Sequence, residues 1–202
     1  MLVPEAKSII MEHHLPDHIV KHCENVYKIA KLIGEKYQAK GQNIDLENLL
    51  SAALLHDLFR IADIPEEGYK NLWDKAEKYD QITWDSIRKR YKGKNHSEAA
   101  YDFLMHKGEE KVASMIKKHY FKAIIDPINK PSTLEEKILT YADKRVLHDK
   151  IVPMSERFED GNKRHSSKEE NMDELNKIYD AYYALEKELL DPIGLKPEDI
   201  KE

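Results

Sequence analysis

The 202-residue sequence is poor in the residues that make turns, with seven glycines and eight prolines. Sheet proteins need many turns, so this scarcity favours long helices joined by few loops. The hydrophobic share of 41% and the charged share of 35% are usual for a globular chain. This length suits one substantial core and is short for two. The composition predicts an all-α fold, with residues 1–202 forming one domain.

The sequence also lacks paired cysteines and long apolar runs. Its lone cysteine, Cys23, cannot form an internal disulfide, which fits a reducing compartment. The first residues do not show a basic start followed by a long apolar stretch, so we expect no signal peptide. No apolar run approaches the roughly 18 residues of a membrane span. We therefore expect a cytoplasmic protein without a membrane partner.

A basic surplus is missing as well. The 33 basic residues stand against 38 acidic residues, which gives a formal charge of −5. A protein that binds nucleic acid through bulk electrostatics normally carries the opposite imbalance. The charge therefore argues against bulk nucleic-acid binding. It still allows a small phosphorylated substrate held by a few local cations.

Two helices are predicted in the first third of the chain. Residues 17–39 carry apolar side chains at spacings of three and four, and Asp17 is placed to cap this helix. A second helix is predicted over 46–61, capped by Asp45. It is apolar nearly all round, which predicts the buried central helix. Residues 63–94 are charged, aromatic and irregular, and we expect a surface flap of one or two short helices.

Capping pairs mark two later helices. Asn95 and Glu98 resemble a capping box for a helix that ends near Gly108. A short helix with His119 on its apolar face is expected to follow. Ser132 and Glu135 are then predicted to cap the next helix.

Residues 150–202 are predicted to form a C-terminal loop and an amphipathic helix at about 169–190. The apolar side of this helix fits either a core or a dimer interface. The sequence therefore leaves a homodimer open.

Ionisable side chains interrupt the apolar faces of several predicted helices. The apolar run 51–55 leads directly into His56 and Asp57, and burying such groups is costly unless they pair or bind a metal. The simplest explanation is a metal site in the middle of the bundle, with ligands on facing helices. The candidate ligands are His22, His56, Asp57, His96, His119 and Asp143.

The order and local contexts of these residues closely resemble the HD superfamily, named for an adjacent His-Asp pair of metal ligands. The matching segments are HCENVYKIAKLI, SAALLHDLFRI and LEEKILTYADKRV. The resemblance covers about residues 15–148 and implies an HD-type helical bundle with its metal site at the centre. Bacterial diadenosine tetraphosphate hydrolases are similar in size and ligand order. A second such dipeptide, His148-Asp149, lies in a polar setting, and we interpret it as unrelated to the metal ligands.

The resemblance implies two metal positions that share one carboxylate. The first would be held by His22, His56, Asp57 and Asp143, and the second by Asp57, His96 and His119. Nitrogen and oxygen ligands without thiolate suit Mn²⁺, Fe²⁺, Co²⁺, Ni²⁺ or Zn²⁺. So many imidazoles argue against Mg²⁺ alone, which fits at most a second position. The implied activity is a phosphohydrolase, in which metal-bound hydroxide attacks a nucleotide or another small phosphate ester or anhydride.

Basic residues near these ligands are candidates for substrate binding. Arg60 lies one turn beyond Asp57 on the same predicted helix, so we assign it, with Asp57, a catalytic role and a phosphate contact. Many relatives carry Gly and Lys where this chain has Phe59 and Arg60, which argues against the cyclic-dinucleotide branch of the family. Lys144 and Arg145 are further substrate-binding candidates. Lys118 and the polar loop 157–165 are weaker ones.

Two other functions are compatible with the same ligands. Some HD relatives are di-iron oxygenases, and fold and ligand set do not by themselves decide the reaction. A non-catalytic, metal-binding regulatory protein is the other alternative. Loss of a ligand would favour it, and this sequence keeps the whole set.

Overall fold

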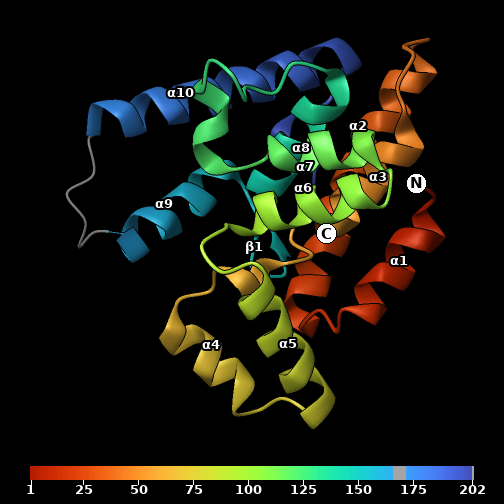
Figure 1. Ribbon diagram of the computed structural model, residues 1–202. Helices are drawn as coiled ribbons and strands as arrows, with labels where there is room; N and C mark the ends of the chain where they lie inside the picture. Colours follow the sequence, from red (N-terminus) through yellow and green to blue (C-terminus); the bar gives the residue numbers. More distant parts are fainter. Residues whose placement is uncertain (166–171, 202) are drawn as a thin grey trace.

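The computed structural model describes residues 1–165 and 172–201 and confirms the all-α prediction (Figure 1). The helices are α1 (Val3–Glu12), α2 (Asp17–Ala39), α3 (Leu46–Leu55), α4 (Glu66–Trp73), α5 (Lys78–Arg90), α6 (His96–His106), α7 (Glu110–Lys117), α8 (Leu134–Lys144), α9 (Met154–His165) and α10 (Met172–Leu190). Short 3₁₀ helices are η1 (Arg60–Ala62), η2 (Phe121–Ile125), η3 (Asp191–Ile193) and η4 (Pro197–Asp199). Strands β1 (Val146–Leu147) and β2 (Lys150–Ile151) pair antiparallel, with Val146 opposite Ile151. Helix α1 is additional to the elements predicted above.

Helix α3 is the buried central helix, as its sequence predicts. Residues 49–55 are all buried, and α3 packs against α1, α2, α7 and α8. Helix α2 approaches it closely at Gly34, where an added Cβ would lie 2.6 Å from Leu46 Cδ1. These contacts place the carboxyl end of α3 in the middle of the molecule.

The end of α3 differs from the prediction, because the helix stops at Leu55 rather than continuing to residue 61. The His56 side chain explains part of this ending. Its Nδ1 donates to the carbonyl oxygen of Ala53 at 2.9 Å, an acceptor in the last turn of the helix. The chain then turns into η1. Asp57 and Arg60 consequently do not lie on one continuous helix.

The predicted helix starts are correct in two cases and shifted in two. Asp45 caps α3 by accepting from the backbone N–H of Asn48, and Asn95 forms the expected capping box at α6. Helix α2 instead has Pro16 at its N-cap, with Asp17 as its first residue. The box at α8 is formed by Thr133 and Glu136, one residue later than predicted.

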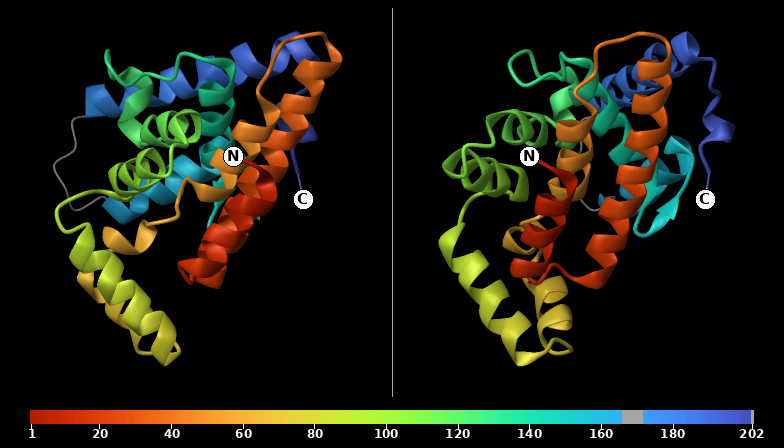
Figure 2. Two further views of the ribbon diagram at one scale, coloured as in Figure 1. Left: turned by 45° about the vertical axis from the view of Figure 1, so that its right-hand side comes forward. Right: turned by 90° about the vertical axis from the view of Figure 1, so that its right-hand side faces the viewer.

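The predicted flap is a hairpin of α4 and α5 that projects from the body of the molecule (Figures 1 and 2). Its base is fastened by side chains of α5. Trp84 Nε1 donates to the carbonyl oxygen of His14 at 2.7 Å. Arg88 Nη1 donates to the carbonyl oxygens of Ile61 and Ile64 at 3.0 and 2.8 Å. The hairpin is therefore an ordered pair of helices that is attached to the body of the molecule at its base.

The C-terminal part contains more helix than predicted, because α9 occupies the segment expected to be a polar loop. Of the amphipathic helix predicted at about 169–190, residues 169–171 lie outside the described part of the chain. The remainder forms α10, whose apolar side chains are buried within the chain against α8 and η2. This side of the helix serves the core. Among the described residues, no helix is long and apolar enough to cross a membrane.

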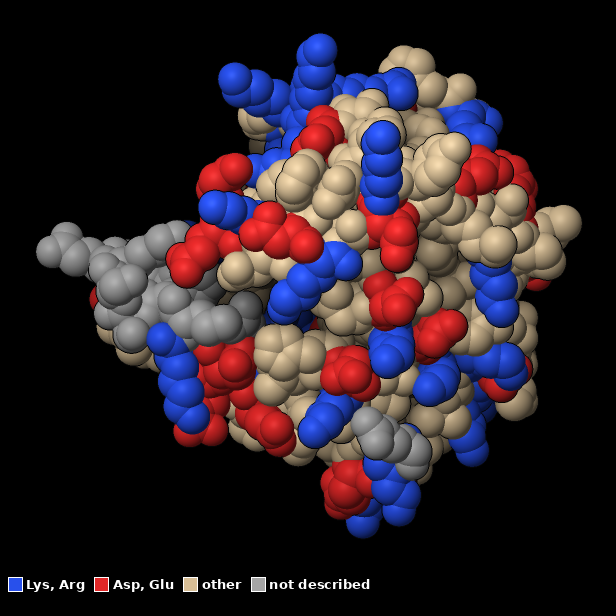
Figure 3. Space-filling model, turned by 90° about the horizontal axis from the view of Figure 1, so that it is seen from below, with Lys and Arg blue, Asp and Glu red and all other residues tan. Residues whose placement is uncertain are grey.

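The surface carries charges of both signs. On the face shown in Figure 3, basic and acidic side chains are interspersed over the described residues. This mixture is consistent with the modest net charge of −5.

Candidate metal centre

The six predicted ligands meet at one place in the interior, although they come from five separate segments of the chain. His22 lies on α2, His56 and Asp57 follow α3, His96 begins α6, His119 follows α7, and Asp143 lies near the end of α8. Helix packing brings these segments together. His56, His119 and Asp143 are buried, and the others are only slightly exposed.

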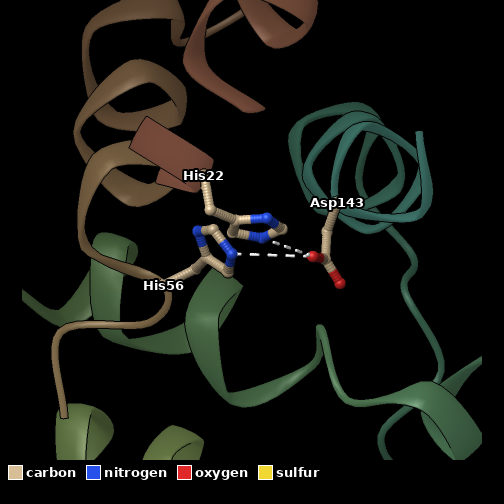
Figure 4. A group of neighbouring side chains, drawn as sticks. All are labelled: His22, His56 and Asp143. Carbon is tan, nitrogen blue, oxygen red and sulfur yellow. Dashed lines mark hydrogen bonds and ion pairs between the residues drawn. The ribbon is translucent and has the colours of Figure 1, made fainter. Parts of the chain in front are cut away.

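Three of these side chains form one compact group (Figure 4). His22 Nε2 lies 3.1 Å from Asp143 Oδ1, and His56 Nε2 lies 3.6 Å from the same oxygen. Each residue offers one ligand atom, and these atoms lie within 4.8 Å of one another. We call this trio the first ligand group.

Asp57 lies between this trio and the remaining two histidines. Its Oδ2 lies 4.0 Å from His22 Nε2 and 3.9 Å from His56 Nε2. Its Oδ1 lies 3.2 Å from His96 Nε2 and 3.9 Å from His119 Nε2. Each carboxylate oxygen therefore faces a different pair of imidazoles. We call His96 and His119 the second ligand group.

The hydrogen bonds of three histidines fix which ring nitrogen faces the interior. The Nδ1 atoms of His22, His56 and His119 lie 3.0, 2.9 and 2.6 Å from the carbonyl oxygens of His148, Ala53 and Ile116. A carbonyl oxygen only accepts, so each neutral ring carries its proton on Nδ1. The Nε2 lone pair is then left to face the centre. Metal-binding histidines are held in this way.

His96 is held by a carboxylate that sequence patterns did not single out. Its Nδ1 lies 2.6 Å from Asp63 Oδ2, which also accepts from the His96 backbone N–H at 3.0 Å. The other oxygen of Asp63 accepts from Arg60 Nη1 at 2.8 Å. Asp63 thus fixes the His96 ring in the same orientation as the other three. Its position just after η1 explains why no helical periodicity revealed it.

The electrostatic setting keeps His119 neutral and the two carboxylates of the centre ionised, which are forms that metal binding requires. Burial, together with the charges of His56 and His96, lowers the pKa of His119 to about 3, so this ring stays neutral. Burial alone would raise the pKa of Asp57. The neighbouring imidazoles of His56, His96 and His22 outweigh burial and hold this pKa below its usual range. Neutral imidazoles and ionised carboxylates are the forms that ligate metals.

The pKa of Asp143 is also well below its usual value. Burial opposes this shift, but the charge of Lys144 and hydrogen bonds from His22 and His56 outweigh it. Both carboxylates in the centre are therefore ionised at neutral pH.

One buried atom shows directly that the residues fit a metal ion. His56 Nε2 is fully buried and has no hydrogen-bond partner among the described residues. An unsatisfied buried polar atom costs free energy, and such atoms call for an explanation. A divalent transition metal accounts for it, because imidazole nitrogen and carboxylate oxygen are suitable donors.

A cavity of about 530 Å³ opens over this centre. Small-molecule sites have volumes of this size. Five of the six predicted ligands and Arg60 line this cavity, together with residues of α9 and α10. The residues that line it include His22, Asp57, Arg60, His96, His119, Asp143, Lys144, Arg157, Phe158 and Tyr179.

The predicted substrate-binding cations have different surroundings. Arg60 and Lys144 both line the cavity. Arg60 begins η1 and donates to Asp63, and Lys144 Nζ donates to Asp143 Oδ2. Lys118 is turned away from the cavity, because its Nζ pairs with Glu136 at 2.8 Å.

The prediction that Arg145 binds substrate is corrected by the structure. Its side chain is only 2% exposed, and it does not line the cavity. The guanidinium donates to Tyr141 Oη and to the carbonyl oxygens of Val152, Pro197 and Ile200. Arg145 therefore fastens the C-terminal segment to the core. Lys144 and Arg145 are adjacent on the helix end and point in different directions, as neighbouring residues there do.

The second His-Asp dipeptide takes part in the site through its backbone. His148 and Asp149 form the turn between β1 and β2, and His148 has a φ of 55°. Their carbonyl oxygens accept from His22 Nδ1 at 3.0 Å and from Asn25 Nδ2 at 2.8 Å. The turn thereby orients a predicted ligand, a role that side-chain type alone could not reveal.

Comparison with protein families agrees with this geometry. The HD domain family matches residues 19–146, which is most of the span inferred from the motifs, and the chain belongs to this family. HD domains bind divalent metals and form a superfamily of metal-dependent hydrolases. Comparison with curated proteins and with solved structures gave no match.

Proposed function

We propose that this protein is a metal-dependent phosphohydrolase that cleaves a phosphoester or phosphoanhydride bond in a small phosphorylated molecule, with nucleotides as the substrate class. One observation carries the proposal. Four imidazoles, each oriented by an acceptor at Nδ1, direct Nε2 at Asp57 and Asp143 beneath a cavity of about 530 Å³. A cytoplasmic location belongs to the same proposal, in keeping with the buried, unpaired thiol of Cys23.

The six predicted ligands would form two metal positions. The first ligand group would hold one ion and the second ligand group another, with Asp57 contributing one oxygen to each. A carboxylate has two oxygens and suits this shared position, which no histidine could fill. When bound, such ions lower the pKa of water and stabilise negative charge on a phosphoryl oxygen.

The protein itself supplies orientation. The carbonyl oxygens of Ala53, Ile116 and His148 and the carboxylate of Asp63 keep the four rings in place. Fixed ligands cost little reorganisation when charge develops on the substrate. Burial of the centre excludes most water from the ligands, and the cavity leaves one side open for a phosphate group.

The experiment that tests this function is a screen of the purified protein against nucleotides and phosphate esters, with metal content measured in the same sample. We expect bound divalent transition metal, hydrolysis of at least one phosphate compound, and loss of hydrolysis on chelation. The Asp57→Asn variant should be inactive at equal protein concentration. A protein that binds no metal, and hydrolyses nothing when Mn²⁺, Co²⁺ or Zn²⁺ is added, would contradict the proposal. Activity that requires iron and oxygen would instead identify the oxygenase chemistry found in some relatives.

A further inference from the structure

The cations that line the cavity differ in whether a carboxylate already neutralises them. Arg60 donates to Asp63, and Lys144 donates to Asp143. Both positive charges are therefore partly neutralised, that of Arg60 by Asp63 and that of Lys144 by the predicted ligand Asp143. Arg157 also lines the cavity, and no ion pair or hydrogen bond joins its side chain to another described residue.

Arg157 is the fourth residue of α9, on the side that faces the cavity. Its Nε is buried and has no hydrogen-bond partner among the described residues. A guanidinium offers a planar fork of donors that matches the oxygens of a phosphate. An unpaired guanidinium in the wall of a cavity has its donors free for an anionic ligand.

The charge of Arg157 acts close to the metal centre. Burial raises the pKa of Tyr182 well above its usual value, the charge of Asp143 raises it further, and the charge of Arg157 opposes the shift. Arg157 and Asp143 both line the cavity. An anion held by Arg157 would be within the same cavity as the predicted ligands.

Aromatic side chains flank Arg157. Phe121, Phe158 and Tyr179 line the same cavity. The rings of Phe158 and Tyr179 are stacked with centroids 4.5 Å apart, and Phe121 lies 6.2 Å from each of them. Aromatic faces of this kind accept a nucleobase by stacking, in contrast to a bare phosphate.

We infer that Arg157 and the aromatic wall of Phe121, Phe158 and Tyr179 form a nucleotide subsite, in which Arg157 binds phosphate oxygens and the wall receives the base. The inference rests on the proposed function for its place in the reaction and assigns the residues that would hold the nucleotide. Phe158, Tyr179 and Arg157 lie beyond residues 19–146 and only Phe121 lies within them, so most of the subsite belongs to the part of this chain outside the HD domain match.

The test is binding rather than turnover. Two probes are compared by equilibrium dialysis with the purified, metal-containing protein. One is the α,β-methylene analogue of ADP, and the other is methylenediphosphonate, which carries the same phosphonates without a nucleoside. The variants are Arg157→Ala, Arg157→Lys and, as a matched control on the same helix, Lys163→Ala. Lys163 is largely exposed and pairs with Glu159. Metal content and thermal unfolding are measured for each variant.

We expect Arg157→Ala to weaken binding of both probes by roughly tenfold to a hundredfold, because it removes charge-assisted hydrogen bonds to phosphate. Arg157→Lys should fall between that variant and the parent, since it keeps the charge and loses the fork. Lys163→Ala should bind both probes as the parent does. In the parent, the ADP analogue should bind about tenfold more tightly than methylenediphosphonate, as stacking of one base predicts.

Three results would overturn the inference. One is equal binding in the parent and in Arg157→Ala. Another is equal affinity of the parent for the two probes, which would remove the role of the aromatic wall. The third is a loss of bound metal in Arg157→Ala, because the arginine would then act through the metal centre. This test measures binding alone and is independent of the hydrolysis screen. If the parent hydrolyses nothing in that screen but shows the expected binding pattern here, the phosphohydrolase proposal is refuted and the subsite remains supported.

Discussion

The two ligand groups of the candidate metal centre are built in different ways. In the first group, His22 and Asp143 lie on α2 and α8 and His56 directly follows α3, and these three helices pack against one another through buried apolar side chains. The second group, His96 and His119, stands at the start of α6 and just beyond the end of α7. Two of the three ligands of the first group therefore lie within packed helices, whereas both ligands of the second group lie at helix ends.

This difference predicts unequal tolerance to change. A side chain on a packed helix keeps its position when a single hydrogen bond is lost, because many apolar contacts remain. A side chain at a helix terminus depends on the few bonds that hold that terminus. We therefore expect the second metal position to be the weaker and more easily disturbed of the two. The following predictions test this comparison, from the largest expected effect to the smallest.

Replacing the shared carboxylate should have the largest effect. Asp57→Asn removes the negative charge that faces both pairs of imidazoles, so we expect loss of both ions and hydrolysis close to background. Metal content by mass spectrometry and the rate on the best substrate are the measurements. If Asp57→Asn retained a full complement of metal, Asp57 would not be shared between two positions.

Removing one ligand from each group should separate the two positions. His119→Ala should remove one metal equivalent and leave the first group occupied, whereas His22→Ala should damage the first position. Both variants should lose most activity, because two ions together stabilise the attacking and leaving oxygens. Anomalous scattering from crystals of each variant would locate the remaining ion. A parent crystal with a single ion, remote from His119, would show that the centre is mononuclear.

Asp63→Asn tests whether the residue that orients His96 matters for metal binding. The amide keeps the shape of the side chain but loses the charge that accepts from His96 and Arg60. Removing such supporting partners typically costs about 10-fold to 100-fold in metal affinity. Titration with Zn²⁺ should show this loss at one position only. The matched control is Asp85→Asn, which alters a carboxylate bonded to Tyr69 in the α4–α5 hairpin and should leave both affinities unchanged.

The smallest effects are expected from two helix caps. Asn95→Ala and Thr133→Ala each remove a capping box, at α6 and α8 respectively. Each should lower the free energy of unfolding by about 1 kcal/mol in chemical denaturation. Only Asn95→Ala should also weaken the second metal position, because Asn95 directly precedes His96. Equal effects of the two variants on metal affinity would contradict the proposed difference between the ligand groups.

Much of the fold could be predicted because local patterns decide local structure. The bounds of α2 match the predicted residues 17–39, since its apolar side chains recur at helical spacing along the whole segment. The capping box at Asn95 was equally visible, because its two residues act on each other across one turn. For the segment of α9 the sequence predicts a loop, because this helix carries few apolar residues to mark a periodicity.

The identity of the candidate ligands could be predicted from the sequence, but the groups that orient them could not. The six candidate ligands stood out because ionisable groups interrupted apolar patterns. The carbonyl oxygens of Ala53, Ile116 and His148 carry no sequence signal, since every residue has one. The sequence predicts that Lys144 and Arg145 both bind substrate, because both are basic and follow Asp143. Only Lys144 lines the cavity, since a step of one residue along a helix turns the side chain by roughly 100°.

The sequence by itself determined the helical class, the buried central helix and the set of imidazoles and carboxylates, because these follow from composition and from spacing within single segments. Only the tertiary structure decided which nitrogen each histidine presents, that Asp57 faces two pairs of rings, that Asp63 supports His96, and that Arg157 is the cavity-lining arginine without a carboxylate partner among the described residues. The physical reason is that these properties depend on distances between atoms from segments far apart in the chain, which packing of the helices alone sets.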